Sequence, residues 1–348
     1  GAKRIFVVPD GALHLLNFYS LPVKKNAYLV EQGPMIHYLS AERDLVIAEG
    51  AEDRGEGLLA LGGADFDASS LFADLNEKGQ VALAGKPVAV ASRVSYRGKR
   101  SSCGDFQNAL FEHLPSTVKE IEDISKIWQQ AETLTNDKEP CAQRISAQAS
   151  EAAFKDQSSG NRILHLATHG FFLGERCTPS KPSHRGVSGV SVMEAMKAVP
   201  ANEENPLLLS GLVLAGANHR HAARPDEEDG ILTAEEIAAM DLSGVEWAVL
   251  SACDTGVGEV RSGEGVFGLR RAFQVAGVRT LIMSFWSVED EATRRWMKAL
   301  YTSRFMDRKG TAQSVRKASL EMLQGRRARG ESTHPFFWAG FAAAGDWR

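Results

Sequence analysis

The chain has 348 residues and a formal net charge of −4, from 40 lysines and arginines against 44 aspartates and glutamates. A chain of this length can bury a full core as one large domain or two smaller ones. The charges form no long runs of one sign, which argues against a general affinity for nucleic acid or anionic lipid. No apolar stretch approaches the ~20 residues of a membrane span, so we expect a soluble protein.

Strand-like apolar runs recur along the chain, and helix-like stretches separate the later ones. This alternation predicts an α/β fold with a mainly parallel sheet flanked by helices. The expected strands are residues 4–8, 27–30, 58–61, 163–167, 245–250 and 280–284.

Four helices have recognisable beginnings or ends. Thr117 and Glu120 have the spacing of a capping box and predict a helix start, and the apolar positions that follow line one face. Thr233 and Glu236 predict a second start in the same way. A third helix is expected from about Gly265 to Val275, ending in a C-terminal glycine at Gly277. The sequence "DEATRRWMKALY" at 290–301 is typical of a fourth.

Segments 93–114, 174–206 and 217–230 are rich in Gly, Pro, Ser and charged residues, and are expected to be loops or insertions. The four cysteines (Cys103, Cys141, Cys177 and Cys253) form no dense disulfide framework and no Cys-x-x-Cys metal pair. They favour a reducing compartment, so we expect a cytoplasmic protein. Because the chain enters a strand-like run at residue 4, we expect it to be part of something longer.

The stretch "SACDTGVGEVRSGEGVFGLRRAF" at 251–273 suggests two different sites. Gly263, Gly265 and Gly268 form a Gly-x-Gly-x-x-Gly, the fingerprint of a dinucleotide site. In that fold the first glycine follows the strand within a few residues, because the turn must deliver the helix to the pyrophosphate. Here about twelve residues separate Ser251 from Gly263. The spacing therefore argues against a nucleotide site, and we expect no cofactor.

Cys253 and His169 occupy equivalent positions in two strand-like runs. "RILHLATHGFF" places His169 at the end of an apolar run and directly before Gly170, and "EWAVLSACDTG" places Cys253 similarly. If the two strands are parallel neighbours, both side chains lie at the carboxyl edge of the sheet. A cysteine needs a base to become a nucleophile, and His169 supplies one. The amides of Gly170 and Cys253 would then form an oxyanion hole.

Other interpretations of these residue types remain open. A strand-end cysteine is often a small buried hydrophobe, and a histidine in an apolar run is often a core residue with satisfied ring nitrogens. His165 is expected to be such a core residue, because in a strand it would lie ~13 Å from His169. His219 and His221 lie in a charged loop and are expected to be solvated. We therefore expect no metal site.

Beyond this pair, the sequence resembles the CHAT domain family, caspase-like cysteine peptidases related to separase. Six motifs match in order: "VVPDGALHLL", "ILHLATHGFF", "GILTAEEIAAM", "LSACDTGVGEV", "GEGVFGLRRAFQVAGVRTLIMSFWSVEDEAT" and "HPFFWAGFAAAG". The resemblance implies a catalytic His169 and a nucleophile at Cys253. It also implies a caspase-like lobe without a dyad at 1–160 and a catalytic lobe at 161–348, which together form one CHAT domain.

The resemblance also implies an activity. We expect a cysteine endopeptidase that cleaves a protein or peptide substrate through a thioester, and that is regulated by an activating protein or by upstream helical repeats. A role in bacterial defence or cell death is typical of the family. A catalytically silent signalling scaffold and a small-molecule thiol hydrolase are the alternatives, and neither membrane nor nucleic acid is an expected direct partner.

Three further residues are candidates for substrate binding. "FWSVEDEAT" resembles the separase stretch that lines the S1 pocket, so Asp290 could pair with a basic P1 residue, or simply stabilise a helix start. Trp286 could form a wall of that pocket or belong to the core. Asp254 could tune the field of the nucleophile loop or hydrogen-bond its turn. Ser251 stands where several basic-specific relatives have aspartate, which weakens the expectation of a basic P1. The insertion at 174–206 could shield the cleft.

Overall fold

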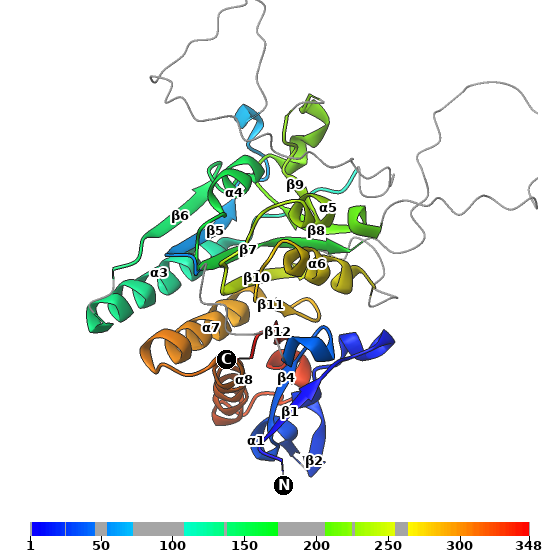
Figure 1. The fold of residues 1–348 in the computed structure, drawn as a ribbon, viewed down its shortest axis with the longest axis vertical. Coiled ribbons are helices and arrows are strands. Elements are labelled where there is room, and N and C mark those ends of the chain that lie inside the picture. The colour runs from blue at the N-terminus through cyan, green and yellow to red at the C-terminus, as the bar shows by residue number, and fades with distance from the viewer. Residues whose placement is uncertain are drawn as a thin grey trace, which may run out of the picture.

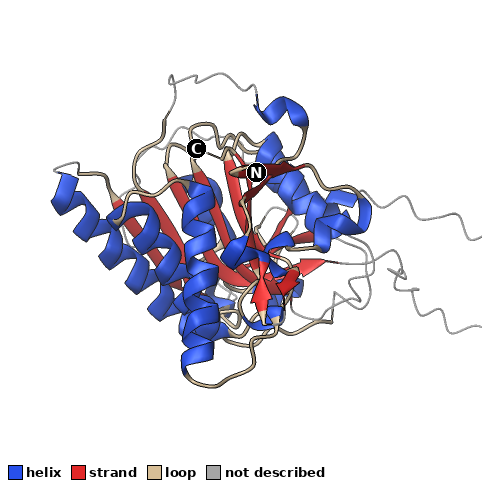
Figure 2. Cartoon of the chain, turned by 90° about the horizontal axis from the view of Figure 1, so that it is seen from below, coloured by secondary structure: helices blue, strands red, loops and turns tan. Residues whose placement is uncertain are grey.

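The computed structural model describes residues 2–24, 26–45, 54–71, 108–135, 138–172, 206–224, 227–254 and 264–347, with only the backbone described at Cys253 and Asp254. A mostly parallel sheet runs through this part of the chain, with helices on both faces (Figures 1 and 2). The expected α/β fold with a mainly parallel sheet is confirmed.

The sheet has ten strands, eight of which follow one path. Their order is β1 (Arg4–Val7), β4 (Met35–Tyr38), β12 (Phe341–Gly345), β11 (Thr280–Ser284), β10 (Trp247–Asp254), β7 (Ile163–Phe172), β5 (Leu58–Ala64) and β6 (Cys141–Ser146). Strand β8 (Ser210–Val213) is antiparallel to β7 and to β9 (Ile231–Thr233). Strand β12 is antiparallel to β11, and β2 (Pro22–Lys24) pairs with β3 (Ala27–Tyr28) outside this sheet.

Two groups of helices cover the two faces of the sheet (Figure 1). One face packs against α3 (Pro115–Thr135), α7 (Asp290–Tyr301) and α8 (Thr311–Ala328). The other packs against α4 (Glu151–Gln157), α5 (Ala234–Ala238) and α6 (Glu264–Val275). Helix α1 (Leu29–Gln32) packs against α8, and a π-helix (Thr302–Met306) continues α7. Short 3-10 helices span Gly11–Leu15, Phe18–Ser20, Glu42–Leu45, Ser69–Leu71, Pro206–Leu208, Ala217–Ala222 and Pro335–Phe337.

The strand sequences explain why both faces are covered. Along β5, Leu58 and Ala60 belong to the core under α3, whereas Leu59 and Leu61 belong to the core under α4 to α6. Successive side chains of a strand point to opposite faces, so a run of apolar residues needs a covering layer on each side. The central strands therefore lie at the middle of a three-layer fold.

One expected strand is partly wrong. Residues 27–30 were expected to be extended, but β3 ends at Tyr28 and α1 begins at Leu29. The backbone N–H of Tyr28 donates to the Glu31 carboxylate at 2.9 Å, and the N–H of Leu29 donates to the carbonyl of Leu21 at 2.8 Å. These local bonds favour a helical turn over continued strand pairing.

The helix predictions are mostly confirmed. Thr233 and Glu236 form a capping box at the start of α5, α7 spans the predicted residues, and Gly277 follows α6 with a φ of +109°. The capping box predicted at Thr117 is wrong, because α3 already begins at Pro115. Proline suits the first turn of a helix, where its missing N–H costs nothing.

The two expected lobes share the sheet. Residues 1–160 contribute β1 and β4 near one edge and β5 and β6 at the other, while 161–348 contribute the strands between them. The boundary at residue 160 stays a prediction. The insertion expected at 174–206 lies outside the described residues except for Pro206, and so do residues 93–107 of the first expected loop. None of the described helices has the length and apolar character needed to cross a membrane.

His37 of β4 gives the fold a testable pH dependence. Its ring is 1% exposed, and Nε2–H donates to the Gly345 carbonyl at 2.9 Å. Burial lowers the pKa of His37 from 6.5 to about 4, although the bond to Gly345 and the charge of Asp346 oppose this. Between these two pKa values the unfolded chain binds a proton that the folded chain does not, so stability falls as the pH drops through this range.

We predict that His37 alone costs the protein about 2 kcal/mol of unfolding free energy between pH 7 and pH 5. Urea unfolding at both pH values would measure this loss in the wild type and in His37→Gln, which keeps an N–H donor but does not titrate. The variant should lose less stability than the wild type, while the exposed control His219→Gln should behave like the wild type. Equal losses in all three proteins would contradict the prediction.

Candidate functional site

Strands β7 and β10 bring His169 and Cys253 side by side. The two strands are parallel neighbours, and their register pairs Cys253 with His169 and Asp254 with Gly170. The expected adjacency of the two strand ends is therefore confirmed. Residues paired across neighbouring strands share a face of the sheet, and this pair lies toward the carboxyl edge, where α/β folds hold ligands. The catalytic roles of the two residues stay predictions.

Strand β7 is longer than the sequence indicated. It was expected to end near residue 167, but it continues to Phe172. Beyond Ala167 its neighbour changes from parallel β5 to antiparallel β8, which pairs Gly170 with Leu212. His169 and Gly170 therefore lie within a strand that has β8 on one side and β10 on the other. The sequence lacked a signal for this change, because β8 follows a long intervening segment.

The His169 ring is held by a carbonyl and two aromatic rings. Nε2 lies 2.7 Å from the carbonyl oxygen of Glu112. A carbonyl can only accept, so Nε2 carries the hydrogen, and in the neutral ring Nδ1 is left as the proton acceptor. The centroids of Phe66 and Phe111 lie 5.2 and 6.0 Å from that of His169. The ring is thus fixed in orientation and tautomer.

The segment that carries Glu112 is itself anchored. The side chain of Asn218 accepts from the N–H of Phe111 at 2.8 Å and donates to its carbonyl at 3.1 Å. Arg220 donates to the carbonyl of Ala109 at 2.8 Å. In the "NHRH" stretch, the sequence drew attention to His219 and His221, which are exposed. The residues that position the Glu112 segment are Asn218, which precedes the histidines, and Arg220, which lies between them.

Burial lowers the pKa of His169 below its ordinary value of 6.5. The bond to the Glu112 carbonyl and the negative charges of Asp290 and Glu112 oppose that effect. A lowered pKa keeps more of the ring neutral near pH 7, in the form that can accept a proton. The nearby carboxylates favour the imidazolium once a proton arrives.

Asp290 stands at the first turn of α7 and contacts the start of α3. Its Oδ2 accepts from the backbone N–H of Ser116 at 2.8 Å. The N-cap of α7 is Glu289, whose carboxylate accepts from the N–H groups of Glu291 and Ala292. Asp290 thus anchors the helix that follows the Glu112 segment, and its charge reaches His169. Its expected role in substrate binding stays a prediction.

Trp286 is partly buried against the core near β4 and β12. Its indole stacks between Phe285 and Phe336, with centroids 6.0 and 6.4 Å away, and its Nε1–H donates to the carbonyl of Phe336 at 3.0 Å. This position is compatible with both expected roles of Trp286, as part of the core or as a wall of the S1 pocket. Asp254, whose backbone alone is described, lies directly after Cys253 at the end of β10.

His165 is a core residue, as predicted. It is fully buried, and its Nε2 lies 2.8 Å from a carboxylate oxygen of buried Glu120. The hydroxyl of Tyr301 lies 3.1 Å from Nδ1, and burial raises the pKa of Tyr301 well above its ordinary value. Both ring nitrogens have partners inside the layer between β7 and the helices α3 and α7. The acid predicted to form a capping box at Glu120 therefore serves this core contact instead.

Two clusters of potential metal ligands occur among the described residues. Around Glu151, Glu228 and Glu236, the ammonium of Lys155 lies within 3.1 Å of each carboxylate and takes the place that a cation would. The second cluster is Asp65, Asp67 and His113. Its Asp67 accepts from Asn218 at 2.8 Å. Neither arrangement supplies a reason to assign a metal.

The glycine fingerprint does not form a phosphate-binding turn where the structure describes it. Gly265 and Gly268 lie inside α6, which begins at Glu264, and Gly268 is buried. These residues therefore belong to a packed helix. Gly263 lies outside the described residues.

The sequence did not indicate the contact between the Glu112 carbonyl and His169. It predicted a pair, Cys253 and His169, without a third member. Every residue has a carbonyl, so no residue type marks the one that contacts His169. The aromatic residues Phe66 and Phe111 likewise come from segments far apart in the sequence. Only the folded chain brings these groups to the ring.

Comparisons with known proteins bear on this arrangement. The sequence matches the CHAT domain family over residues 1–346. It is also similar to tetratricopeptide repeat protein 28 of Mus musculus, 31% identical over 121 residues, and to that of Homo sapiens, 29% identical over 121 residues. Each match covers 35% of this chain and 5% of the relative. With a family match over nearly its whole length and a mostly parallel sheet flanked by helices, the chain belongs to the CHAT domain family, whose fold is caspase-like.

Proposed function

We propose that this CHAT domain is a cysteine endopeptidase in which Cys253 is the nucleophile and His169 the general base. The observation that carries the proposal is the register that pairs Cys253 with His169 on neighbouring parallel strands. A thiol is mostly protonated at neutral pH and needs such a base to attack a carbonyl. The neutral, oriented His169 ring supplies the base.

The reaction has two halves. In the first, His169 Nδ1 takes the thiol proton, the Cys253 sulfur attacks the scissile carbonyl carbon, and the amides of Gly170 and Cys253 stabilise the oxyanion. The tetrahedral intermediate collapses to a thioester as His169 returns the proton to the leaving amine. In the second half, His169 takes a proton from water, the hydroxide attacks the thioester, and the proton returns to the departing sulfur. The Glu112 carbonyl keeps Nε2–H in place throughout.

We propose that three residues bind substrate: Asp290, Trp286 and Asp254. Asp290 would form an ion pair with a basic P1 residue. The charge of Asp290 supports this role, because a carboxylate and a guanidinium form a strong charge-assisted bond. One of its oxygens already accepts from Ser116, so the second oxygen would contact the substrate.

The proposed partners are a protein or peptide substrate and an activating protein or upstream repeat domain, in the cytoplasm. The similarity to tetratricopeptide repeat protein 28 supports a repeat context, because that relative is named for its tetratricopeptide repeats. The same similarity favours a second candidate function, a scaffold that signals without cleaving. A small-molecule thiol hydrolase would use the same pair on an ester.

We predict that the purified chain cleaves peptides from a digested proteome, and that Cys253→Ala and His169→Ala both abolish cleavage. Mass spectrometry of the new termini would detect the cleavage and reveal the P1 residue. Cys141→Ala is the matched control and should cleave normally, because that cysteine lies in β6 with its pKa raised by burial.

Three outcomes contradict the endopeptidase. Cleavage that persists in Cys253→Ala assigns the activity to another group or a contaminant. No cleavage by the wild type, with hydrolysis of simple esters that requires Cys253, identifies the thiol hydrolase. No reaction of either kind, even when the protein is assayed together with a partner that it binds, identifies the scaffold.

Asp290→Asn separates the two roles of Asp290. Asparagine can still accept from Ser116 but removes the charge that raises the pKa of His169, so the imidazole should titrate at a lower pH in the variant. NMR of the His169 ring measures this in the free protein. If Asp290 also binds P1, cleavage after Arg or Lys should fall about 10- to 100-fold while other sites are spared.

Glu291→Gln is the control. Glu291 neighbours Asp290 and contacts the Ser116 hydroxyl, but it is not among the charges that shift the pKa of His169. An unchanged titration of His169 in Asp290→Asn contradicts the electrostatic role. Uniform loss of cleavage at all P1 residues contradicts the P1 role.

A further inference from the structure

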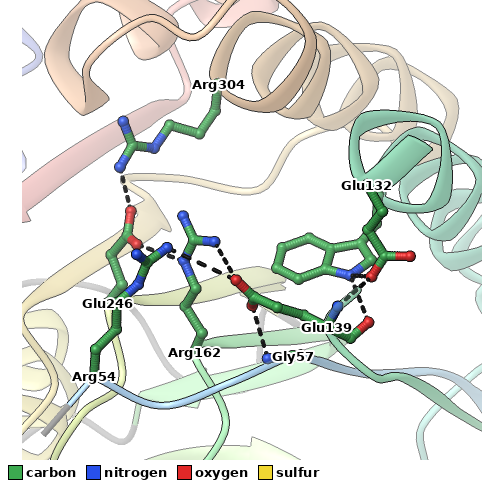
Figure 3. Close-up of polar contacts among 8 residues, drawn as sticks. Arg54, Gly57, Glu132, Glu139, Arg162, Glu246 and Arg304 are labelled. Atoms are coloured by element: carbon green, nitrogen blue, oxygen red, sulfur yellow. Dashed lines mark hydrogen bonds and ion pairs between the residues drawn. The ribbon is translucent and has the colours of Figure 1, made fainter. Parts of the chain in front are cut away.

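A cavity lined by arginines lies at the amino edge of the sheet, opposite the proposed site. It consists of two adjoining hollows of about 280 and about 350 Å³ that share Arg54, Arg162 and Arg304. Arg162 directly precedes β7, Glu246 directly precedes β10, and Glu139 lies just before β6 (Figure 3). The cavity is thus built from the segments that directly precede β10, β7 and β6.

This cavity is separate from the proposed peptidase site. Arg162 directly precedes β7 and His169 is the seventh of its ten residues, so seven residue steps, or roughly 23 Å of extended strand, separate them. No group of the Cys253 and His169 pair can reach the cavity over that distance. Its chemistry therefore needs its own explanation.

The acidic groups around Arg162 are already occupied. Glu139 accepts from the N–H of Gly57 at 2.9 Å through one oxygen and from Arg162 at 2.8 Å through the other. Glu246 accepts from Arg162 at 2.7 Å and from Arg304 through its other oxygen. Burial favours the neutral acid at Glu246, but the charges of Arg304 and Arg162 outweigh it and lower its pKa. Both carboxylates are thus paired with arginines.

A third acid in the cavity wall, Glu132, contacts two neutral donors. Glu132 accepts from the indole N–H of Trp128 at 2.9 Å and from the backbone N–H of Glu139 at 3.0 Å (Figure 3). These two bonds fix the wall of the cavity around Trp128.

The arginines, in contrast, have more N–H groups than these ion pairs use. Each guanidinium carries five N–H groups. Arg162 and Arg304 spend theirs partly on Glu246, Glu139 and the Lys309 carbonyl. A guanidinium nitrogen of Arg54 lies 3.8 Å from a carboxylate oxygen of Glu139. The first hollow therefore combines carboxylates that already have partners with guanidinium groups that can donate to further acceptors.

Arg308 adds a further cation to the first hollow. Among the described residues its side chain has neither an ion-pair nor a hydrogen-bond partner. Its φ of +53° is uncommon for a residue with a side chain, and it follows the π-helix Thr302–Met306 that carries Arg304. Both features are irregular backbone of the kind that clusters at functional sites. The turn holds Arg308 and Arg304 at the same cavity.

We propose that this cavity binds a small molecule that carries a phosphate or carboxylate group, held by Arg54 and Arg308 beside the Arg162–Glu246–Arg304 ion pairs. Guanidinium groups bind such oxyanions through paired, charge-assisted hydrogen bonds. The first hollow, of about 280 Å³, is at the lower end for small-molecule sites and favours a compact anion. Trp128 and Phe305 supply an apolar wall for the rest of the ligand.

Isothermal titration calorimetry with two probes, pyrophosphate and citrate, tests the proposal on the intact chain. We expect saturable binding of at least one probe with a Kd below about 1 mM. The double variant Arg54→Gln/Arg308→Gln should weaken it about tenfold or more and leave the fold intact, because these two side chains support few contacts. Arg271→Gln, an exposed arginine on α6, is the matched control and should bind like the wild type.

The two probes also distinguish the ligand's chemistry. Preference for pyrophosphate assigns a phosphorylated ligand, and preference for citrate assigns a carboxylate. Absence of saturable binding by both probes up to about 10 mM overturns the proposal, and so does equal binding by the wild type and the double variant. Neither readout depends on peptidase activity, so this inference stands or falls separately from the proposed function.

Discussion

The parallel register of β7 and β10 is the constraint on which the rest of this structure depends. It pairs Cys253 with His169, and a shift of one residue would move one of them to the opposite face of the sheet. The register is held by apolar residues on both strands, such as Leu166 and Leu250, which are buried under the helices of one face. The packing of the core thus fixes the relation between the proposed nucleophile and its base.

A second layer of contacts determines how His169 can act. The Glu112 carbonyl fixes the ring's tautomer, and Asp290 connects the start of α3, just beyond that carbonyl, to α7. Burial and charge oppose each other at the imidazole, since burial favours the neutral base and the carboxylates favour the imidazolium. A general base needs both forms to be accessible during one reaction cycle. The surroundings of His169 therefore suit proton transfer better than they suit a permanent charge.

Local patterns in the sequence predicted the parts of the fold that depend on local physics. The apolar runs marked the central strands, and the Thr233 and Glu236 capping box marked α5, because these signals are complete within a few residues. The pattern failed at Glu120, where an acid at capping distance is used by His165 from a distant strand. The Cys253 and His169 pair could be predicted, because each residue follows an apolar run that marks a central strand. The Glu112 carbonyl could not, since only tertiary structure selects one carbonyl among many.

The most direct test of the central claim is the rate at which iodoacetamide alkylates Cys253 as a function of pH, resolved by mass spectrometry for each cysteine. If His169 is the base of this pair, the pH profile of Cys253 in the wild type should carry an inflection that is lost in His169→Ala. Cys141, whose pKa burial raises, should show the same profile in both proteins. Identical Cys253 profiles in the two proteins would show that His169 does not activate the thiol, and would contradict the dyad.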